Sequence, residues 1–196
     1  MRTACRLFVT LLALAAIATQ AAASAGTEVK TYRPLTAQGH LRYALHLHHG
    51  SGTCWTASEA VARRGSVRAL RCMSGNVILD PCFGTRFAAR SDLVCVDAPW
   101  DRSGLRLALA RKVPTAALKP GGGRNAWGIV LRGGTRCLFE QGATNVVHGR
   151  RLNYTCNNKT YLWGVPDRRT PYWRIRSSKD AGGRGMHFVA ISRVWR

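Results

Sequence analysis

Acidic residues are scarce in this chain. It contains 9 Asp and Glu against 30 Lys and Arg, which gives a formal net charge of +21 over 196 residues. A charge of this size bears on solubility and partners rather than on the fold, and it predicts attraction to anionic polymers. The alternative interpretation is a basic surface that is merely solvated, as in a proteome rich in Arg and Ala.

Several signatures of catalysis are missing. No serine lies in a G-x-S-x-G sequence, which excludes the usual nucleophile elbow. The run Gly121–Gly123 is not followed by the Lys-Ser/Thr pair of a phosphate-binding P-loop. If the exported cysteines are all paired, no thiol remains for Cys–His chemistry. We therefore predict no catalytic residue and no cofactor.

Long apolar runs are absent after the first 25 residues. The uncharged run Leu7–Ile17 follows Arg2 and Arg6 and is followed by the small residues Ala23–Ala25. This three-part pattern predicts a secretory signal peptide over residues 1–25. A retained anchor is the alternative, but the run is shorter than the ~20 apolar residues of a transmembrane helix. We expect a secreted protein, extracellular or periplasmic, with no transmembrane segment in the mature chain.

Six cysteines remain when the signal peptide takes Cys5 away. An even number in an exported chain predicts a disulfide framework, and six cysteines allow fifteen pairings. Zinc is the competing interpretation, but no C-x-x-C pair is present and export favours oxidation. We expect each cysteine to pair with its neighbour in sequence, giving Cys54–Cys72, Cys82–Cys95 and Cys137–Cys156.

The mature part, 171 residues once 25 are subtracted from 196, is long enough for one domain. We expect an N-terminal segment over residues 26–50 and a single disulfide-stabilised β-rich domain over residues 51–196. Residues 41–49 alternate as a strand that Gly50–Gly52 would end, and residues 56–62 can form a short helix. The predicted fold class is mainly β, an antiparallel sandwich or small barrel with one short helix.

Turn signals follow one another in the second half of the chain. Gly133-Gly134 lies between two apolar runs and predicts a hairpin, as does Asn157-Asn158, because Asn tolerates the positive φ of tight turns. Asp80-Pro81 predicts another turn. Residues 187–195 carry apolar side chains on both faces, which predicts a central strand.

Arginines alternate with aromatic residues between positions 150 and 176. Guanidinium groups bind phosphate and carboxylate in a forked geometry, and an exposed Trp can stack on a sugar or a base. The alternative is a packed core below a solvated basic face. The predicted anion-binding residues are Arg150, Arg151, Arg168, Arg169, Arg174, Arg176 and Trp163.

Two other groups of residues were candidates for chemistry. His46 and His48 share one strand face, but no carboxylate is nearby to complete a metal site, so we predict a polar face and no metal. Glycoside hydrolysis needs two converging carboxylates, which could come from Asp80, Asp97, Asp101 or Glu140. No pair of them is singled out by the sequence.

Two motifs resemble those of a group of uncharacterised exported proteins of high-GC bacteria. The first runs from Asn76 through Asp80-Pro81-Cys82-Phe83, and is followed by Cys95 and Pro99-Trp100. The second is Gly142-Ala143-Thr144, followed by Leu152-Asn153-Tyr154 and Cys156. The resemblance covers about residues 54–195 and implies secretion and a shared cysteine framework, but it supplies no catalytic residue.

These observations favour a non-enzymatic binding module for an anionic envelope or extracellular polymer, such as wall glycan, lipopolysaccharide or nucleic acid bound without sequence preference. Two alternatives stay open. One is a cell-envelope hydrolase whose carboxylates converge in the fold, and the other is a secreted protein–protein module such as an inhibitor or toxin. The ligand and the oligomeric state stay open as well.

Overall fold

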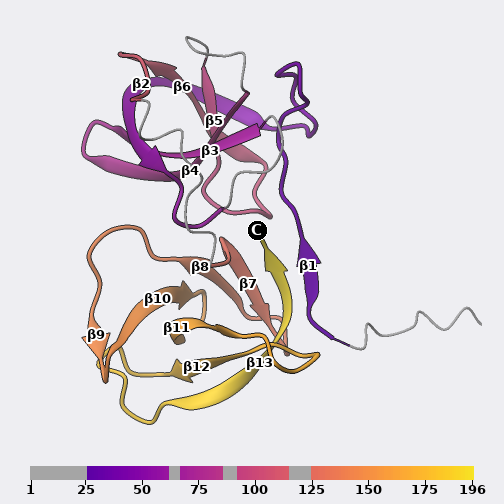
Figure 1. The fold of residues 1–196 in the computed structure, drawn as a ribbon, viewed down its shortest axis with the longest axis vertical. Coiled ribbons are helices and arrows are strands. Elements are labelled where there is room, and N and C mark those ends of the chain that lie inside the picture. The colour runs from indigo at the N-terminus through magenta and orange to yellow at the C-terminus, as the bar shows by residue number, and fades with distance from the viewer. Residues whose placement is uncertain (1–25, 62–66, 86–91, 115–124) are drawn as a thin grey trace, which may run out of the picture.

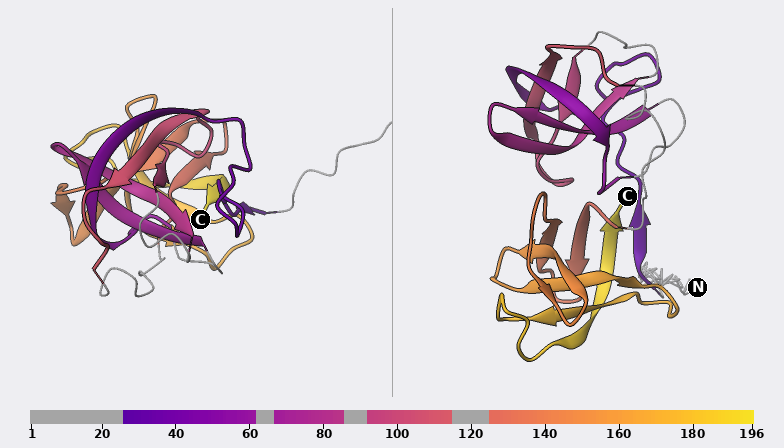
Figure 2. Two further views of the ribbon diagram at one scale, coloured as in Figure 1. Left: turned by 90° about the horizontal axis from the view of Figure 1, so that it is seen from above. Right: turned by 60° about the vertical axis from the view of Figure 1, so that its left-hand side comes forward.

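The computed structural model describes residues 26–61, 67–85, 92–114 and 125–196. In these ranges the strands form two small closed barrels, one above the other along the long axis of the molecule (Figure 1). The C-terminus lies between the barrels, as two further views show (Figure 2). The prediction of a mainly β fold is confirmed, and of its two alternatives, sandwich and small barrel, the structure has the barrel. The signal peptide predicted over residues 1–25, with Cys5, lies outside the described residues.

The first barrel has five strands, and each follows its neighbour in sequence. The ladders are antiparallel except the one between β2 and β6, which is parallel and closes the barrel. The strands are β2 (His46–Ala57), β3 (Val67–Ser74), β4 (Val77–Thr85), β5 (Leu93–Cys95) and β6 (Ser103–Leu109).

Strand β2 continues through Gly50–Gly52, so the expected strand end there is wrong. A Cβ atom at Gly52 would collide with the carbonyl oxygen of Met73 on β3 and lie 2.9 Å from the Leu107 side chain on β6. Glycine is therefore needed because β2 passes close to both neighbouring strands. The boundary expected at residue 50 falls inside this strand.

The predicted helix over residues 56–62 is wrong for the residues described. Thr56 and Ala57 end β2, and bends follow. The hydroxyl of Ser58 accepts hydrogen bonds from the backbone N–H groups of Ala60 (3.2 Å) and Val61 (2.9 Å). The same hydroxyl donates to the Asp80 carboxylate on β4, so the segment is held in a turn against that strand.

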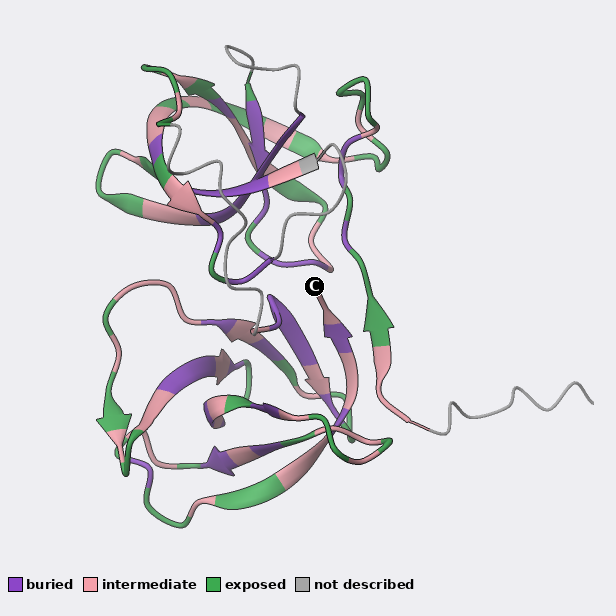
Figure 3. Cartoon of the chain, in the orientation of Figure 1, coloured by how far each residue is buried: buried purple, intermediate pink, exposed green. Residues whose placement is uncertain are grey.

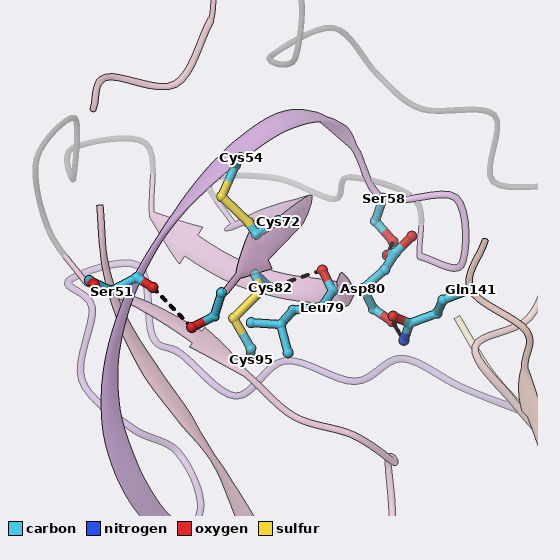
Figure 4. Close-up of a disulfide and its surroundings, with 10 residues drawn as sticks. Ser51, Cys54, Ser58, Cys72, Leu79, Asp80, Cys82, Cys95 and Gln141 are labelled. Atoms are coloured by element: carbon cyan, nitrogen blue, oxygen red, sulfur yellow. Dashed lines mark hydrogen bonds between the residues drawn. A yellow bond between two sulfur atoms is a disulfide. The ribbon is translucent and has the colours of Figure 1, made fainter. Parts of the chain in front are cut away.

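All three disulfides join the cysteines that are neighbours in sequence: Cys54–Cys72, Cys82–Cys95 and Cys137–Cys156. The predicted pairing is confirmed, and the zinc interpretation is wrong. Each bridge links directly opposite residues of paired strands. The first two lie side by side in the first barrel (Figure 4). They fill its interior together with leucines such as Leu70, Leu93 and Leu107. A barrel this small has little room for side chains, and the sulfur atoms form much of its core.

The turn predicted at Asp80-Pro81 is also wrong, because both residues lie within β4 and are joined by a cis peptide bond. The ladder between β3 and β4 shifts register at this point, between Leu70 and Cys72. Proline has no N–H to donate and is found within sheets at such irregularities. Here the strand bends without ending.

The second barrel contains most of the chain after residue 125. Its closed order is β7–β8–β10–β11–β12–β13, with β13 pairing back to β7, and β1 and β9 add short edges. The strands are β1 (Glu28–Lys30), β7 (Gly128–Leu131), β8 (Arg136–Phe139), β9 (Val146–Val147), β10 (Arg150–Cys156), β11 (Tyr161–Asp167), β12 (Arg174–Ser178) and β13 (His187–Trp195).

Strand β13 has β1, β7 and β12 as partners, which confirms the central strand predicted over residues 187–195. The hairpin at Gly133-Gly134 is confirmed, with φ values of 103° and 87°. The hairpin after Cys156 is confirmed as well, but its left-handed residue is Lys159 (φ 56°) rather than an asparagine.

The two barrels share one hydrophobic cluster. Tyr32, from the segment that runs from β1 to β2, packs on Phe83 of the first barrel and on Trp127 before β7, with ring centroids 5.5 and 5.0 Å apart. The Gln141 side chain donates a 2.6 Å hydrogen bond to the backbone carbonyl of Asp80. Buried residues are accordingly found in both barrels and where they face each other (Figure 3). Within the ranges described, no helix has the length and apolarity to cross a bilayer.

Candidate functional site

A pocket of about 600 Å³ lies on the second barrel and collects several of the predicted arginines. Arg150 and Arg151 come from β10, Arg169 from the loop after β11, and Arg176 from β12. The other lining residues are Gly149, Trp163, Gly164, Val165, Pro166, Asp167 and Phe188. The sequence separations hide this grouping, because two strands and a loop bring the arginines together.

An irregularity in β11 makes room for the pocket. Trp163 pairs with Arg176, but Asp167 pairs with Arg174, so four steps along β11 match two along β12. The extra residues of β11 must leave the regular ladder, as in a β-bulge. Gly164 has a φ of 73°, which favours glycine, and a Cβ there would face the Arg150 side chain at 3.8 Å.

Strand register sets the neighbours of Arg176. It pairs with Trp163 on one side and with Phe188 on the other, so the three side chains project from the same face of the sheet. Its guanidinium lies 4.5 Å from the centroid of the Phe188 ring. In the described part of the chain it has no hydrogen bond or ion pair, and it is half-buried. Its donors are therefore available to a ligand.

Arg151 has a structural role instead. Its guanidinium donates to the Asn153 side chain (2.8 Å) and to the carbonyl oxygens of Glu140 (3.0 Å) and Gly142 (2.8 Å). It also lies 5.3 Å from the centre of the Phe139 ring. These contacts occupy most of its donors, so Arg151 supplies positive potential to the pocket more than free hydrogen bonds.

Arg150 and Arg169 differ in how many of their hydrogen-bond donors are already used. Arg150 donates one hydrogen bond of 3.2 Å, to the carbonyl of His148. Arg169 forms a forked pair with Asp167, with bonds of 2.9 and 2.8 Å. The side-chain and backbone hydrogen bonds from Arg169 lower the pKa of Asp167 to about 2. A competing anion would therefore have to replace the Asp167 carboxylate at Arg169.

The other three predicted residues, Arg168, Arg174 and Trp163, differ from these four in position or exposure. Arg168 and Arg174 do not line the pocket; they stack over Trp173 (4.7 Å) and Phe188 (5.4 Å). Trp163 is only 1% exposed, and its indole N–H donates to Ser178 Oγ at 2.9 Å. Its ring is covered and offers no open face for stacking.

Phe188 lines the pocket, and the sequence analysis did not name it. It is 47% exposed and lies between the guanidinium groups of Arg174 and Arg176. It belongs to a strand with apolar residues on both faces. That pattern predicted a central strand and gave no sign that this ring is exposed. An exposed aromatic ring held between two arginines gives the pocket an apolar wall beside its charges.

The candidate carboxylates differ in their surroundings, and of the four named in the sequence analysis Asp97 and Asp101 lie near each other. Asp80 is buried, Asp97 is exposed, and Glu140 uses its backbone carbonyl to hold Arg151. The arginine pocket contains one carboxylate, Asp167, and a second pocket between the barrels also contains one, Asp101. His46 and His48 are exposed on β2, and among the described residues no group of three His, Cys, Asp or Glu could hold a metal ion.

Comparisons of the chain with protein-family models, with curated proteins and with solved structures gave no match.

Proposed function

We propose that this protein is a non-enzymatic binding module for an anionic polymer and that the arginine pocket of the second barrel is its contact site. The observation that carries the proposal is the convergence of Arg150, Arg169 and Arg176 on one pocket with a single carboxylate, Asp167. Arg150 and Arg176 have most of their donors free among the described residues. A phosphate or carboxylate group that enters there meets charge-assisted donors from two strands.

The pocket also suits a polymer with rings between its charges. Phe188 and Val165 expose apolar surface beside the arginines. Polymers that alternate anionic groups with sugars or bases offer both kinds of contact along one chain. The large net charge supports the same proposal, because it attracts such polymers from a distance.

The test is the affinity of the mature, oxidised protein for heparin, duplex DNA and a wall polymer at one fixed salt concentration. The double variant Arg150→Ala/Arg176→Ala removes two charges from the pocket. The matched control Arg111→Ala/Lys112→Ala removes two exposed charges after β6. We expect the pocket variant to lose about tenfold or more in affinity and the control to lose much less, because charge-assisted contacts are lost only in the first.

Equal losses in both variants would contradict a shaped site. They would mean that the polymer responds only to the overall charge of the protein.

A further inference from the structure

The second pocket, of about 440 Å³, lies where the two barrels meet. Its residues come from the β1–β2 segment, the loop between β5 and β6, and the end of β13. Ligand pockets often occur at such junctions between structural units. The lining residues are Lys30, Thr31, Tyr32, Tyr43, Ala44, Leu45, Pro99, Trp100, Asp101, Arg102 and Trp195.

Four aromatic side chains form the walls of this junction pocket. Trp100 and Trp195 meet edge to face, with centroids 5.5 Å apart and an interplanar angle of 73°. Tyr32 and Tyr43 are also 5.5 Å apart, with an angle of 35°. Tyr43 is 45% exposed, so part of its ring is accessible from solvent.

The position of Trp100 depends on a glycine in the other barrel. A Cβ at Gly128, the first residue of β7, would lie 2.7 Å from Pro99 and 3.0 Å from the Trp100 ring. The absence of a side chain lets the Pro99-Trp100 loop approach β7 closely. The aromatic wall is thus built into the contact between the barrels.

The charges at the junction pocket favour neither a cation nor an anion. Arg136 covers Trp100 at 5.5 Å and Arg193 covers Trp195 at 5.6 Å, so these rings already have cationic partners. Asp101 faces the same space and would repel an anion, while Lys30 is paired with Glu28 at 3.2 Å. Burial, followed by the nearby Asp97, raises the pKa of Asp101, and Arg136 opposes that effect.

Polar groups that can bind hydroxyls accompany the rings. Asp101 accepts hydrogen bonds and Arg102 donates them. Tyr32 is only 8% exposed, and its hydroxyl has no hydrogen-bond partner among the described residues.

We propose that the junction pocket binds a pyranose ring of a neutral oligosaccharide. A sugar has C–H faces that pack on aromatic rings and hydroxyl groups that both donate and accept. It carries no charge for the surrounding groups to repel. A flat base stacks best between parallel rings, whereas the rings here are inclined to one another. This inference goes beyond anionic-polymer binding, because a neutral sugar does not need the arginine pocket.

The experiment titrates neutral tetrasaccharides of glucose, N-acetylglucosamine and mannose into the full mature protein at about 0.5 M NaCl, where long-range charge effects are screened. Binding is followed by tryptophan fluorescence and by the indole N–H signals of Trp100 and Trp195 in NMR spectra. We expect at least one tetrasaccharide to bind with a Kd below about 10 mM and to shift both indole signals.

Three variants locate the binding. Tyr43→Ala should weaken the affinity about tenfold or more, because it removes an exposed wall of the pocket. Trp55→Ala changes an exposed aromatic residue on β2 outside the pocket and should leave the affinity unchanged. Arg150→Ala/Arg176→Ala should also leave it unchanged, which separates this proposal from the proposed function.

The proposal is overturned if no tetrasaccharide binds below about 10 mM, or if the indole signals of Trp100 and Trp195 do not shift in the wild-type protein. Adenosine or uridine binding more tightly than every sugar would overturn it as well, in favour of a base site. The wild-type NMR result decides the matter even if Tyr43→Ala does not fold.

Discussion

At the scale of single residues, Asp80 shows how a motif residue acquires a structural role. Its side chain accepts hydrogen bonds from the Ser58 hydroxyl and from the Glu59 N–H (3.1 Å), and its backbone carbonyl accepts from Gln141 of the second barrel (Figure 4). One residue thereby joins the turn after β2, the strand β4 and the opposite barrel. The carboxyl is committed to these contacts rather than to a reaction.

Stability should depend on the protonation of Asp80. Burial raises its pKa to about 6, although the Ser58 and Glu59 hydrogen bonds lower it. In the unfolded chain the ordinary value is 3.8, so between these values the folded protein holds a proton that the unfolded chain has lost. This contribution is therefore full below about pH 4 and is lost as the pH rises through 6. The loss is about 3 kcal/mol.

Denaturant unfolding with the disulfides intact measures this effect. Between pH 4 and pH 7 the free energy of unfolding of wild type should fall by about 3 kcal/mol relative to that of Asp80→Asn. Asp167→Asn is the control. The Asp167 pKa is lowered to about 2, so its contribution is lost only as the pH falls below 4. Parallel curves for wild type and Asp80→Asn would contradict the assignment.

The candidate site could be predicted only in part from its residues. The sequence identified the arginine cluster, and four of the six named arginines line one pocket. It could not separate Arg151, whose donors are used by carbonyls, from Arg176, whose donors are free. Those carbonyls belong to the segment between β8 and β9, and only the fold brings them to Arg151. It could not find Phe188 or Tyr43 either, since exposure of an aromatic ring is decided by packing.

At the scale of elements, two glycines on β2 let this strand pass close to its neighbours in the first barrel. Gly50 and Gly52 both lie on β2, but a Cβ at Gly52 would meet the backbone of β3, whereas one at Gly50 would meet the Leu105 side chain at 3.1 Å. Backbone cannot yield, while the end of a leucine side chain can rotate. The two positions therefore tolerate a methyl group differently.

Gly52→Ala should lower the free energy of unfolding by about 1–3 kcal/mol or more, as overpacking does, and Gly50→Ala should lower it by clearly less. Thermal and denaturant unfolding of the two variants give the comparison. Equal losses, or a larger loss for Gly50→Ala, would show that β2 does not pass as close to β3 as described here.

Local signals predicted the hairpins at Gly133-Gly134 and after Cys156 and the central strand β13, because turn chemistry and alternation act over a few residues. They failed where a distant element decides the conformation. Ser58 is held in a turn by a hydrogen bond to Asp80, 22 residues further along the chain. Gly52 lies inside β2 because β3 and β6 leave no room for a side chain there. The cysteine pairing was predictable since neighbouring strands of a meander bring neighbouring cysteines together.

At the scale of the whole molecule, two barrels and a shared core replace the single sandwich or barrel expected from the sequence. From β1, which lies beside β13, the chain crosses to build the first barrel and then returns to build the second. No periodic pattern in the sequence predicts this crossing. It creates the junction pocket, because rings from both barrels and from the crossing segment meet there.

Two kinds of binding are expected at two different pockets of this molecule. Charged ligands are expected at the arginine pocket of the second barrel, with strong dependence on salt. A neutral sugar is expected at the junction pocket, with little such dependence. The same polymer could use both if it carries sugars and anionic groups along its chain.

The central claim is that arginines of one pocket, rather than the total charge, hold the anionic ligand. The most direct measurement is the salt dependence of duplex DNA binding by wild type, Arg150→Ala/Arg176→Ala and Arg111→Ala/Lys112→Ala. Each phosphate contact adds about 0.9 to the slope of log K against log salt, so the pocket variant should lose nearly 2 and the control almost nothing. A flat dependence for wild type, or the same slope in both variants, would contradict the claim.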